Sequence, residues 1–169
     1  MKKVLIALMF MASPVWAASS NLKILGTFDD WTAYVFEDAK GKTCYMATEP
    51  TKSVGKYKIR DDVFLFVTHH PNEKTFDVVN IMAGYTYKKS SKPQLSIDDN
   101  KAETLAIHAD TAWSKDSKTD EKLVAQMKKG SSATLKGTSA RGTLTTDTFS
   151  LKGFSKAYNE IQKACGRVE

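Results

Sequence analysis

The three histidines are the first side chains that could act as general bases or metal ligands near neutral pH. His69 and His70 are neighbours, and neighbouring side chains of an extended backbone point to opposite faces, so the two cannot readily share a metal ion. His108 stands alone near the end of an expected strand, and the sequence contains no HExxH pattern. We therefore expect exposed turn histidines, no metal site, and a fold that tolerates replacement of all three by Ala.

No other set of residues has the spacing of a catalytic site. A G-x-S-x-G nucleophile motif is absent, and the dispersed glycines form no phosphate-binding loop. The paired acids Asp61-Asp62 and Asp98-Asp99 could be read as glycosidase carboxylates, but acids that are adjacent in sequence usually mark solvated turns. The sequence therefore predicts no catalytic residue and no cofactor.

Cys44 and Cys165 are the two cysteines of the chain. In an oxidising compartment an even number of cysteines favours a disulfide between them. A bridge that closes a loop of about a hundred residues stabilises a fold by roughly 4 to 5 kcal/mol in the chain-entropy model. Two buried free thiols or a metal-binding pair remain the alternatives, although two cysteines are too few for a structural zinc site.

The N-terminus has the pattern of a secretory signal peptide over residues 1–17. Lys2 and Lys3 precede an apolar stretch from Val4 to Met11, and small residues lead to a cleavage site after Ala17. A membrane span is the alternative, but it needs about 20 apolar residues, and Pro14 interrupts this stretch. We expect a periplasmic or secreted protein that has no integral membrane span.

Composition and charge narrow the possible partners of the mature chain. Residues 18–169 have the length of one ordinary domain. The formal net charge of +6 falls by two when the signal peptide is removed, and the lysines are scattered rather than clustered in the sequence. This pattern favours a solvated surface over a nucleic-acid site, and it leaves weak attraction to anionic cell surfaces open.

The first half of the chain shows the period-two alternation of β-strands. Trp31, Ala33 and Val35 alternate with polar or aromatic residues, which places Trp31 in the core. The apolar run 63–67 suits a central strand that is covered on both faces. It is expected to stop at a turn over 69–72, and a further strand is expected over 75–82.

Shorter elements are expected in the second half. Strands 94–97 and 104–108 surround a turn, and polar segments 88–93 and 114–118 are expected to be surface loops. A helix is expected over 119–129, because apolar residues recur at helical spacing and Gly130 follows as a stop signal.

A hairpin and a helix are expected to close the chain. The Thr-rich segment 131–150 favours two strands joined at 139–142, where Gly142 can adopt a positive φ and Asp147 can accept from local backbone donors. The last helix carries a stripe of residues expected to be buried: Phe154, Ala157, Tyr158, Ile161, Ala164 and Cys165. This stripe would direct Cys165 inward, so that a bridge to Cys44 would clamp the helix to the sheet.

Two residues are candidates for binding a partner. Trp113 lies beside polar loop residues, where core packing and a role in an interface are about equally expected. Arg141 lies at the expected hairpin tip, where packing requires no cation, so it is either a solvated charge or a contact to an acidic partner.

Distinctive stretches extend over nearly all of the mature chain. They are Trp31, Cys44-Tyr45, Ala83-Gly84-Tyr85, Ala112-Trp113, Met127 to Ser131, Gly137 to Thr143 and Thr146 to Ala157. In these residues and their order the sequence resembles the invasion-associated locus B family. The resemblance implies a small exported protein of alphaproteobacterial type, found in the periplasm or envelope and, in pathogens, linked to entry into host cells. It implies no enzymatic activity.

These observations lead to one expected architecture and one expected role. The fold is expected to be mainly β, a single-domain sandwich or partly closed barrel with two short helices, the C-terminal helix docked on the sheet. The function is expected to be non-catalytic binding of an envelope or host protein. The alternative is a periplasmic hydrolase whose His or carboxylate site the order of the sequence conceals.

Overall fold

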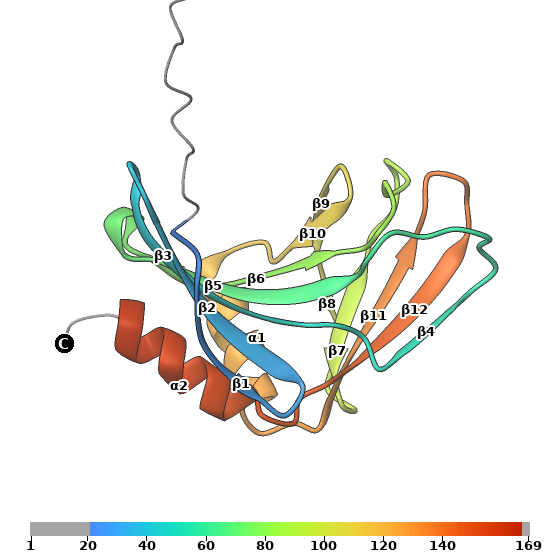
Figure 1. Cartoon of the computed structure of the whole chain (residues 1–169). Coiled ribbons are helices and arrows are strands. Elements are labelled where there is room, and N and C mark those ends of the chain that lie inside the picture. The colour runs from blue at the N-terminus through green and yellow to red at the C-terminus, as the bar shows by residue number, and fades with distance from the viewer. Residues whose placement is uncertain (1–20, 167–169) are drawn as a thin grey trace, which may run out of the picture.

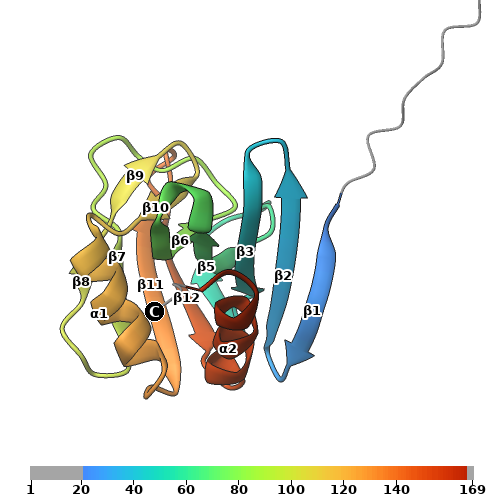
Figure 2. The ribbon, with the colours of Figure 1, turned by 90° about the vertical axis from the view of Figure 1, so that its left-hand side faces the viewer.

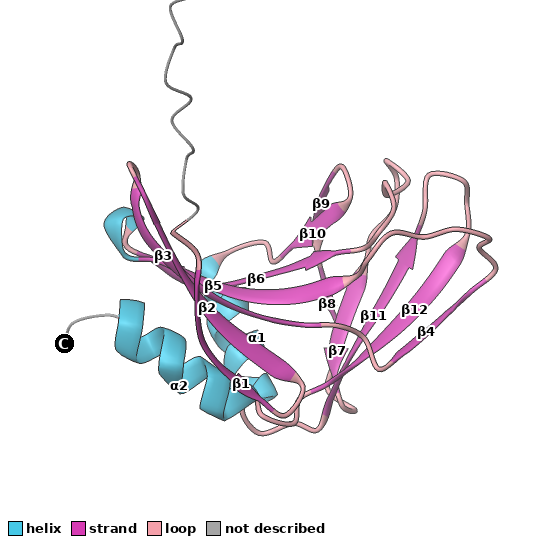
Figure 3. Cartoon of the chain, viewed as in Figure 1, coloured by secondary structure: helices cyan, strands magenta, loops and turns pink. Residues whose placement is uncertain are grey.

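The described residues form two antiparallel β-sheets and two α-helices (Figures 1 and 3). The computed structural model describes residues 21–166, so the expected signal peptide lies outside the described residues. The seven-stranded sheet contains, in spatial order, β1 (Lys23–Phe28), β2 (Trp31–Asp38), β3 (Gly41–Thr48), β5 (Phe64–His70), β6 (Thr75–Met82), β10 (Thr111–Trp113) and β9 (Ala106–His108). The five-stranded sheet contains β4 (Lys52–Gly55), β12 (Leu144–Ser150), β11 (Ser132–Thr138), β7 (Gln94–Ile97) and β8 (Glu103–Thr104). The two sheets do not close into a barrel. Of the two expected architectures, a sandwich and a partly closed barrel, the structure therefore shows the sandwich.

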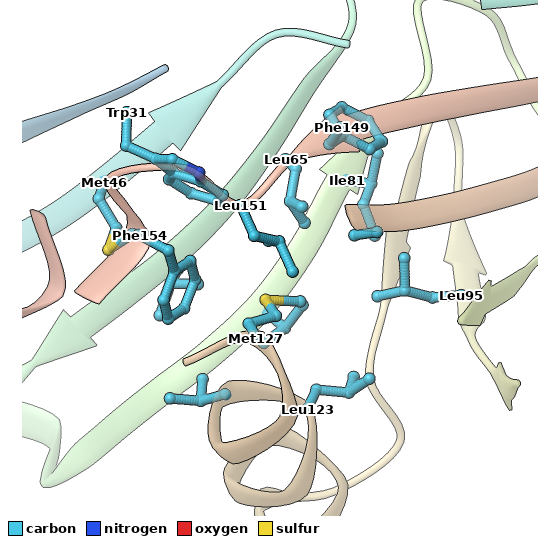
Figure 4. Packing of buried hydrophobic residues seen from close by; sticks show 14 of the residues in the cluster. Trp31, Met46, Leu65, Ile81, Leu95, Leu123, Met127, Phe149, Leu151 and Phe154 are labelled. Carbon is cyan, nitrogen blue, oxygen red and sulfur yellow. The ribbon is translucent and has the colours of Figure 1, made fainter. Parts of the chain in front are cut away.

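The core lies between the two sheets and beneath the helices (Figure 4). Alternation along the strands directs one set of side chains inward, and large fully buried members of this set are Trp31, Met46, Leu65, Ile81, Leu95 and Phe149. Phe154 joins them from the start of the C-terminal helix. The indole N–H of Trp31 donates to the backbone carbonyl of Ser150 at 3.0 Å, which satisfies its polar atom inside the core. The expected core position of Trp31 is therefore confirmed.

Helix α1 (Ser117–Met127) begins two residues before its expected start, because Asp116 caps it. The Asp116 carboxylate accepts from the backbone N–H of Thr119 at 2.8 Å, which satisfies one of the free amides of the first turn. In the same helix the buried carboxylate of Asp120 accepts from the N–H of Val79 on β6 at 2.8 Å and from the hydroxyl of Ser114. Burial raises the pKa of Asp120 above its usual range. The first turn of α1 thus fastens the helix to the seven-stranded sheet.

Helix α2 (Phe154–Cys165) packs across β1, β2 and β3 (Figure 2). Its last residue forms a disulfide. The ring of Phe154 meets Trp31 edge to face at a centroid distance of 5.0 Å. Cys165 is bonded to Cys44 of β3, with the two Cα atoms 5.8 Å apart. The predicted disulfide and the predicted docking of the last helix are both confirmed, and the alternatives of free thiols or a metal-binding pair are wrong.

The histidines differ from the sequence-based expectation. Strand β5 continues through His70 instead of ending in a turn at residue 69, and this places His69 completely inside the protein. The ring of His69 accepts from the backbone N–H of Asp77 at 3.0 Å and lies edge to face on Tyr158 of α2. The expectation of an exposed turn histidine is therefore wrong for His69. His70 is half-buried and His108 is exposed.

The expected strand over 104–108 is interrupted at Leu105. Strand β8 pairs with β7 in the five-stranded sheet, whereas β9 pairs with β10 in the seven-stranded sheet. Leu105, which separates them, is 3 % exposed and packs into the core. The chain therefore changes sheets here, because burying Leu105 between the layers turns the backbone out of one ladder and into the other.

Candidate ligand-binding site

A buried ion pair joins the β4–β5 connection to the inner face of β12. The two terminal nitrogens of Arg60 donate to the two carboxylate oxygens of Asp147, each at 2.7 Å. The Arg60 side chain is 5 % exposed and that of Asp147 is fully buried. Arg60 Nε also donates to the carbonyl of Ala83 at 2.7 Å, and the hydroxyl of Ser53 donates to Asp147 at 2.7 Å. Both charges are thus paired and hydrogen-bonded, as burial requires.

Asp147 corrects a sequence-based expectation. We expected its carboxylate to accept from local backbone donors, but Asp147 lies in the middle of β12 and bonds to residues far away in the sequence. Its position follows from the period of two, since Thr145 and Phe149 on either side also point inward. In the sequence, Asp147 stands two residues from Thr145 and two from Phe149 on the same face of the strand. This spacing was the signal that could have indicated a buried carboxylate in need of a cationic partner. Sequence reasoning missed Arg60 altogether.

Two tyrosine rings surround the Arg60 guanidinium. Its central carbon lies 5.4 Å from the centroid of Tyr57 and 4.9 Å from that of Tyr85. Burial opposes the charge, but the hydrogen bonds and attraction of Asp147 outweigh it, so the pKa of Arg60 is raised and the group stays cationic. The Tyr85 hydroxyl pairs with that of Thr145 at 2.7 Å, and burial raises the pKa of Tyr85.

Beside this ion pair lies an open pocket of about 660 Å³. Three segments line it: residues 56–61, residues 84–86, and the β11–β12 turn with the start of β12. The exposed cations Lys56, Lys58 and Arg141 lie along its lining, and Asp61 is the one acid among the described lining residues. None of these three cations forms an ion pair within residues 21–166. The pocket therefore presents unpaired positive charge to solvent.

Gly84 fixes the junction between two of the lining segments. Its φ is +67°, and a Cβ there would lie 2.1 Å from the carbonyl oxygen of Asp61. The close approach lets the N–H of Asp61 donate to the Gly84 carbonyl at 3.1 Å. A side chain at residue 84 would separate the two segments, so the shape of the pocket depends on glycine at this position.

The two predicted binding residues lie in different places. Arg141 lines the pocket from the hairpin tip, as a contact to an acidic partner would require. Trp113 lies on β10 beside the start of α1, where it is 38 % exposed and its indole N–H donates to Thr111. The structure does not bring the two residues into one site, and Arg141 is the one that lines the pocket beside the buried ion pair.

Two neighbouring residues at the tip of the β11–β12 hairpin are expected to affect stability differently, Gly142 through its backbone and Arg141 through its side chain. Gly142 has a φ of +83° and open space around its Cβ position, so Gly142→Val is expected to lower the free energy of unfolding by about 1 to 3 kcal/mol through backbone strain alone. Arg141→Ala is expected to change it by less than about 0.5 kcal/mol, because the exposed side chain has no ion pair within the described residues. Urea unfolding of both variants measures this. A strongly destabilised Arg141→Ala protein would contradict it.

Two further observations concern metal ions and membranes. Within residues 21–166, His, Cys, Asp and Glu side chains form no group of three or more that could hold a metal ion. No helix in the same range is long and apolar enough to cross a membrane.

Comparison with known proteins gives one match. Residues 31–162 match the family model described as Invasion associated locus B (IalB) protein. The matched range includes both Arg60 and Asp147 and every segment that lines the pocket. The chain matches no curated protein and no solved structure.

Proposed function

We propose the following function for this chain, which belongs to the invasion associated locus B family. The protein is an exported, non-catalytic binding protein of the cell envelope, which recognises an acidic component through the basic pocket. It works in the periplasm or after secretion. In a pathogen, the same binding would contribute to the invasion of host cells.

The unpaired cations around the pocket carry the proposal. Lys56 and Lys58 come from the β4–β5 connection and Arg141 from the β11–β12 turn, so an acidic group in the pocket would meet positive charge from two segments. The buried Arg60–Asp147 pair supports the lining from beneath, because it ties residues 56–61 to β12. The backbone of this segment is thereby held in place before a ligand binds, so ordering it costs little conformational entropy.

Export is supported by the disulfide and by the N-terminal sequence. The Cys44–Cys165 bridge is of the kind that persists in oxidising compartments. Residues 1–17 have the composition of a secretory signal peptide. A non-catalytic role agrees with the lining of the pocket, in which hydroxyl groups and cations surround a single carboxylate, that of Asp61.

Crosslinking in intact cells tests the proposal. The wild-type protein is expected to capture a specific acidic component of the envelope or of a host cell. Lys58→Glu combined with Arg141→Glu should abolish the capture, because like charges would then face the ligand. Lys115→Glu combined with Lys118→Glu, at exposed positions outside the basic pocket, is the matched control and should leave capture unchanged. Equal capture by all three proteins would contradict a site at the basic pocket.

A further inference from the structure

Exposed apolar side chains gather at the corner of the molecule that holds the basic pocket. They are Ile59 at 87 % exposure, Leu144 at 73 %, Val54 at 53 % and Tyr57 at 38 %. Large aliphatic side chains left in water lose the free energy that burial would provide, and a group of them usually marks an interaction surface.

Contacts and strand register place these residues along the β4 edge of the five-stranded sheet. Val54 lies opposite Thr146 in the β4–β12 ladder, and Leu144 is two residues from Thr146, so Val54 and Leu144 share the outward face of the sheet. A Cβ built on Gly55 would lie 2.8 Å from the Tyr57 ring and 3.0 Å from the Leu144 carbonyl oxygen. Ile59 lines the pocket with Tyr57. Val54 and Leu144 therefore lie on the outward face of the sheet, whereas Tyr57 and Ile59 lie at the pocket beside the same edge, because Gly55 pairs with the inward-facing Thr145. We call this edge, with its four exposed apolar residues, the apolar corner.

Cations alternate with the apolar side chains at this corner. Lys56 and Lys58 flank Tyr57 in the sequence, Ile59 follows Lys58 directly, and Arg141 lies three residues before Leu144. The aliphatic groups come from three segments and are separated by charges, so they do not form the continuous apolar centre of a typical protein interface. A fluid bilayer with anionic headgroups needs no matching shape, and it accommodates both the inserted aliphatic groups and the surrounding cations.

We propose that the apolar corner docks on an anionic lipid membrane surface. The inference rests on the proposed function, and it identifies the acidic component as the phosphate headgroups of the bilayer. Lys56, Lys58 and Arg141 contact the phosphates, while Ile59 and Leu144 enter the boundary between headgroups and acyl chains. The protein is held at the membrane surface and does not cross it.

Vesicle co-sedimentation of the purified protein without detergent tests this docking. The protein is expected to bind vesicles of equal parts phosphatidylcholine and phosphatidylglycerol, and to bind vesicles of phosphatidylcholine alone much more weakly. Ile59→Ser should lower the partition coefficient about tenfold, because it removes the most exposed aliphatic group. Lys56→Gln combined with Lys58→Gln should lower it about twenty-five-fold, since each lysine near an anionic surface contributes about fivefold.

The matched control is Ile24→Ser, which removes an exposed isoleucine from β1 outside the apolar corner. This variant should bind as the wild-type protein does. Equal losses for Ile24→Ser and Ile59→Ser, or no preference for phosphatidylglycerol, would overturn the docking surface. Binding of free glycerol phosphate without vesicle binding would overturn it too, because it would show a pocket for a soluble anion.

The vesicle assay and the crosslinking assay can contradict the membrane inference and the proposed function independently of each other. Suppose that the wild-type protein captures an acidic protein, that the Lys58→Glu, Arg141→Glu variant does not, and that neither binds vesicles. This result would overturn the membrane inference and leave the basic pocket as a binding site. Unchanged crosslinking of every variant would instead contradict the proposed function.

Discussion

Replacing Asp147 with Ala is expected to lower the free energy of unfolding by about 3 to 5 kcal/mol. The substitution removes the carboxylate partner of a guanidinium whose side chain is 5 % exposed, so a positive charge stays buried without a counter-charge. It also removes the acceptor of the Ser53 hydroxyl. A loss of this size approaches the whole stability of many small proteins, and urea unfolding followed by circular dichroism would measure it.

Two further variants distinguish the buried pair from ordinary charge loss. Asp29→Ala removes a partly exposed carboxylate that pairs with Lys152 at 3.1 Å, and it should cost less than about 1 kcal/mol. Arg60→Met combined with Asp147→Leu removes both charges and should be more stable than Asp147→Ala, since no lone charge is left inside. An Asp147→Ala protein as stable as Asp29→Ala would show that solvent reaches the guanidinium.

Loss of the disulfide is expected to have the second large effect. The bridge joins residues that are 121 positions apart, and the chain-entropy model assigns such a loop about 4 to 5 kcal/mol at 25 °C. Cys44→Ala combined with Cys165→Ala should therefore lower the free energy of unfolding by about 4 kcal/mol. The cause is greater freedom of the unfolded chain, together with weaker attachment of the C-terminal end of α2 to β3.

Reduction provides the control for this variant. A reductant should destabilise the wild-type protein by a similar amount and leave the double Ala variant unchanged, because that variant has no bond to reduce. Thermal unfolding of the four samples measures the difference. If the variant unfolds at the same temperature as the oxidised wild type, the bridge does not constrain the unfolded chain as the model assumes.

Local patterns predicted most of the architecture. The period-two alternation gave the bounds of β6 (Thr75–Met82) and β7 (Gln94–Ile97) as the structure has them, and the apolar stripe of α2 gave its buried face. The disulfide followed from the number of cysteines and the expected compartment. These features depend on residues near one another in sequence or on a count, which a sequence displays directly.

The features that the sequence did not reveal depend on contacts between distant residues. Arg60 and Asp147 are 87 positions apart, and their pairing requires the β4–β12 register. His69 is buried because α2 returns to cover the end of β5. Lys56, Lys58 and Arg141 line one pocket only because the β11–β12 hairpin folds back beside the β4–β5 connection. Each of these depends on which segments meet, and local propensity does not decide that.

The change of sheet at Leu105 affects how the molecule can move. Because β8 and β9 are separated by one residue and belong to different sheets, a hinge that parted the two layers would have to pull Leu105 out of the core. The two layers therefore cannot separate as independent halves near this point. Separation of β8 from β7 would strain the pairing of β9 with β10, so the two sheets unfold as one cooperative unit. Local opening is then confined to the loops and the outer edges of the sheets.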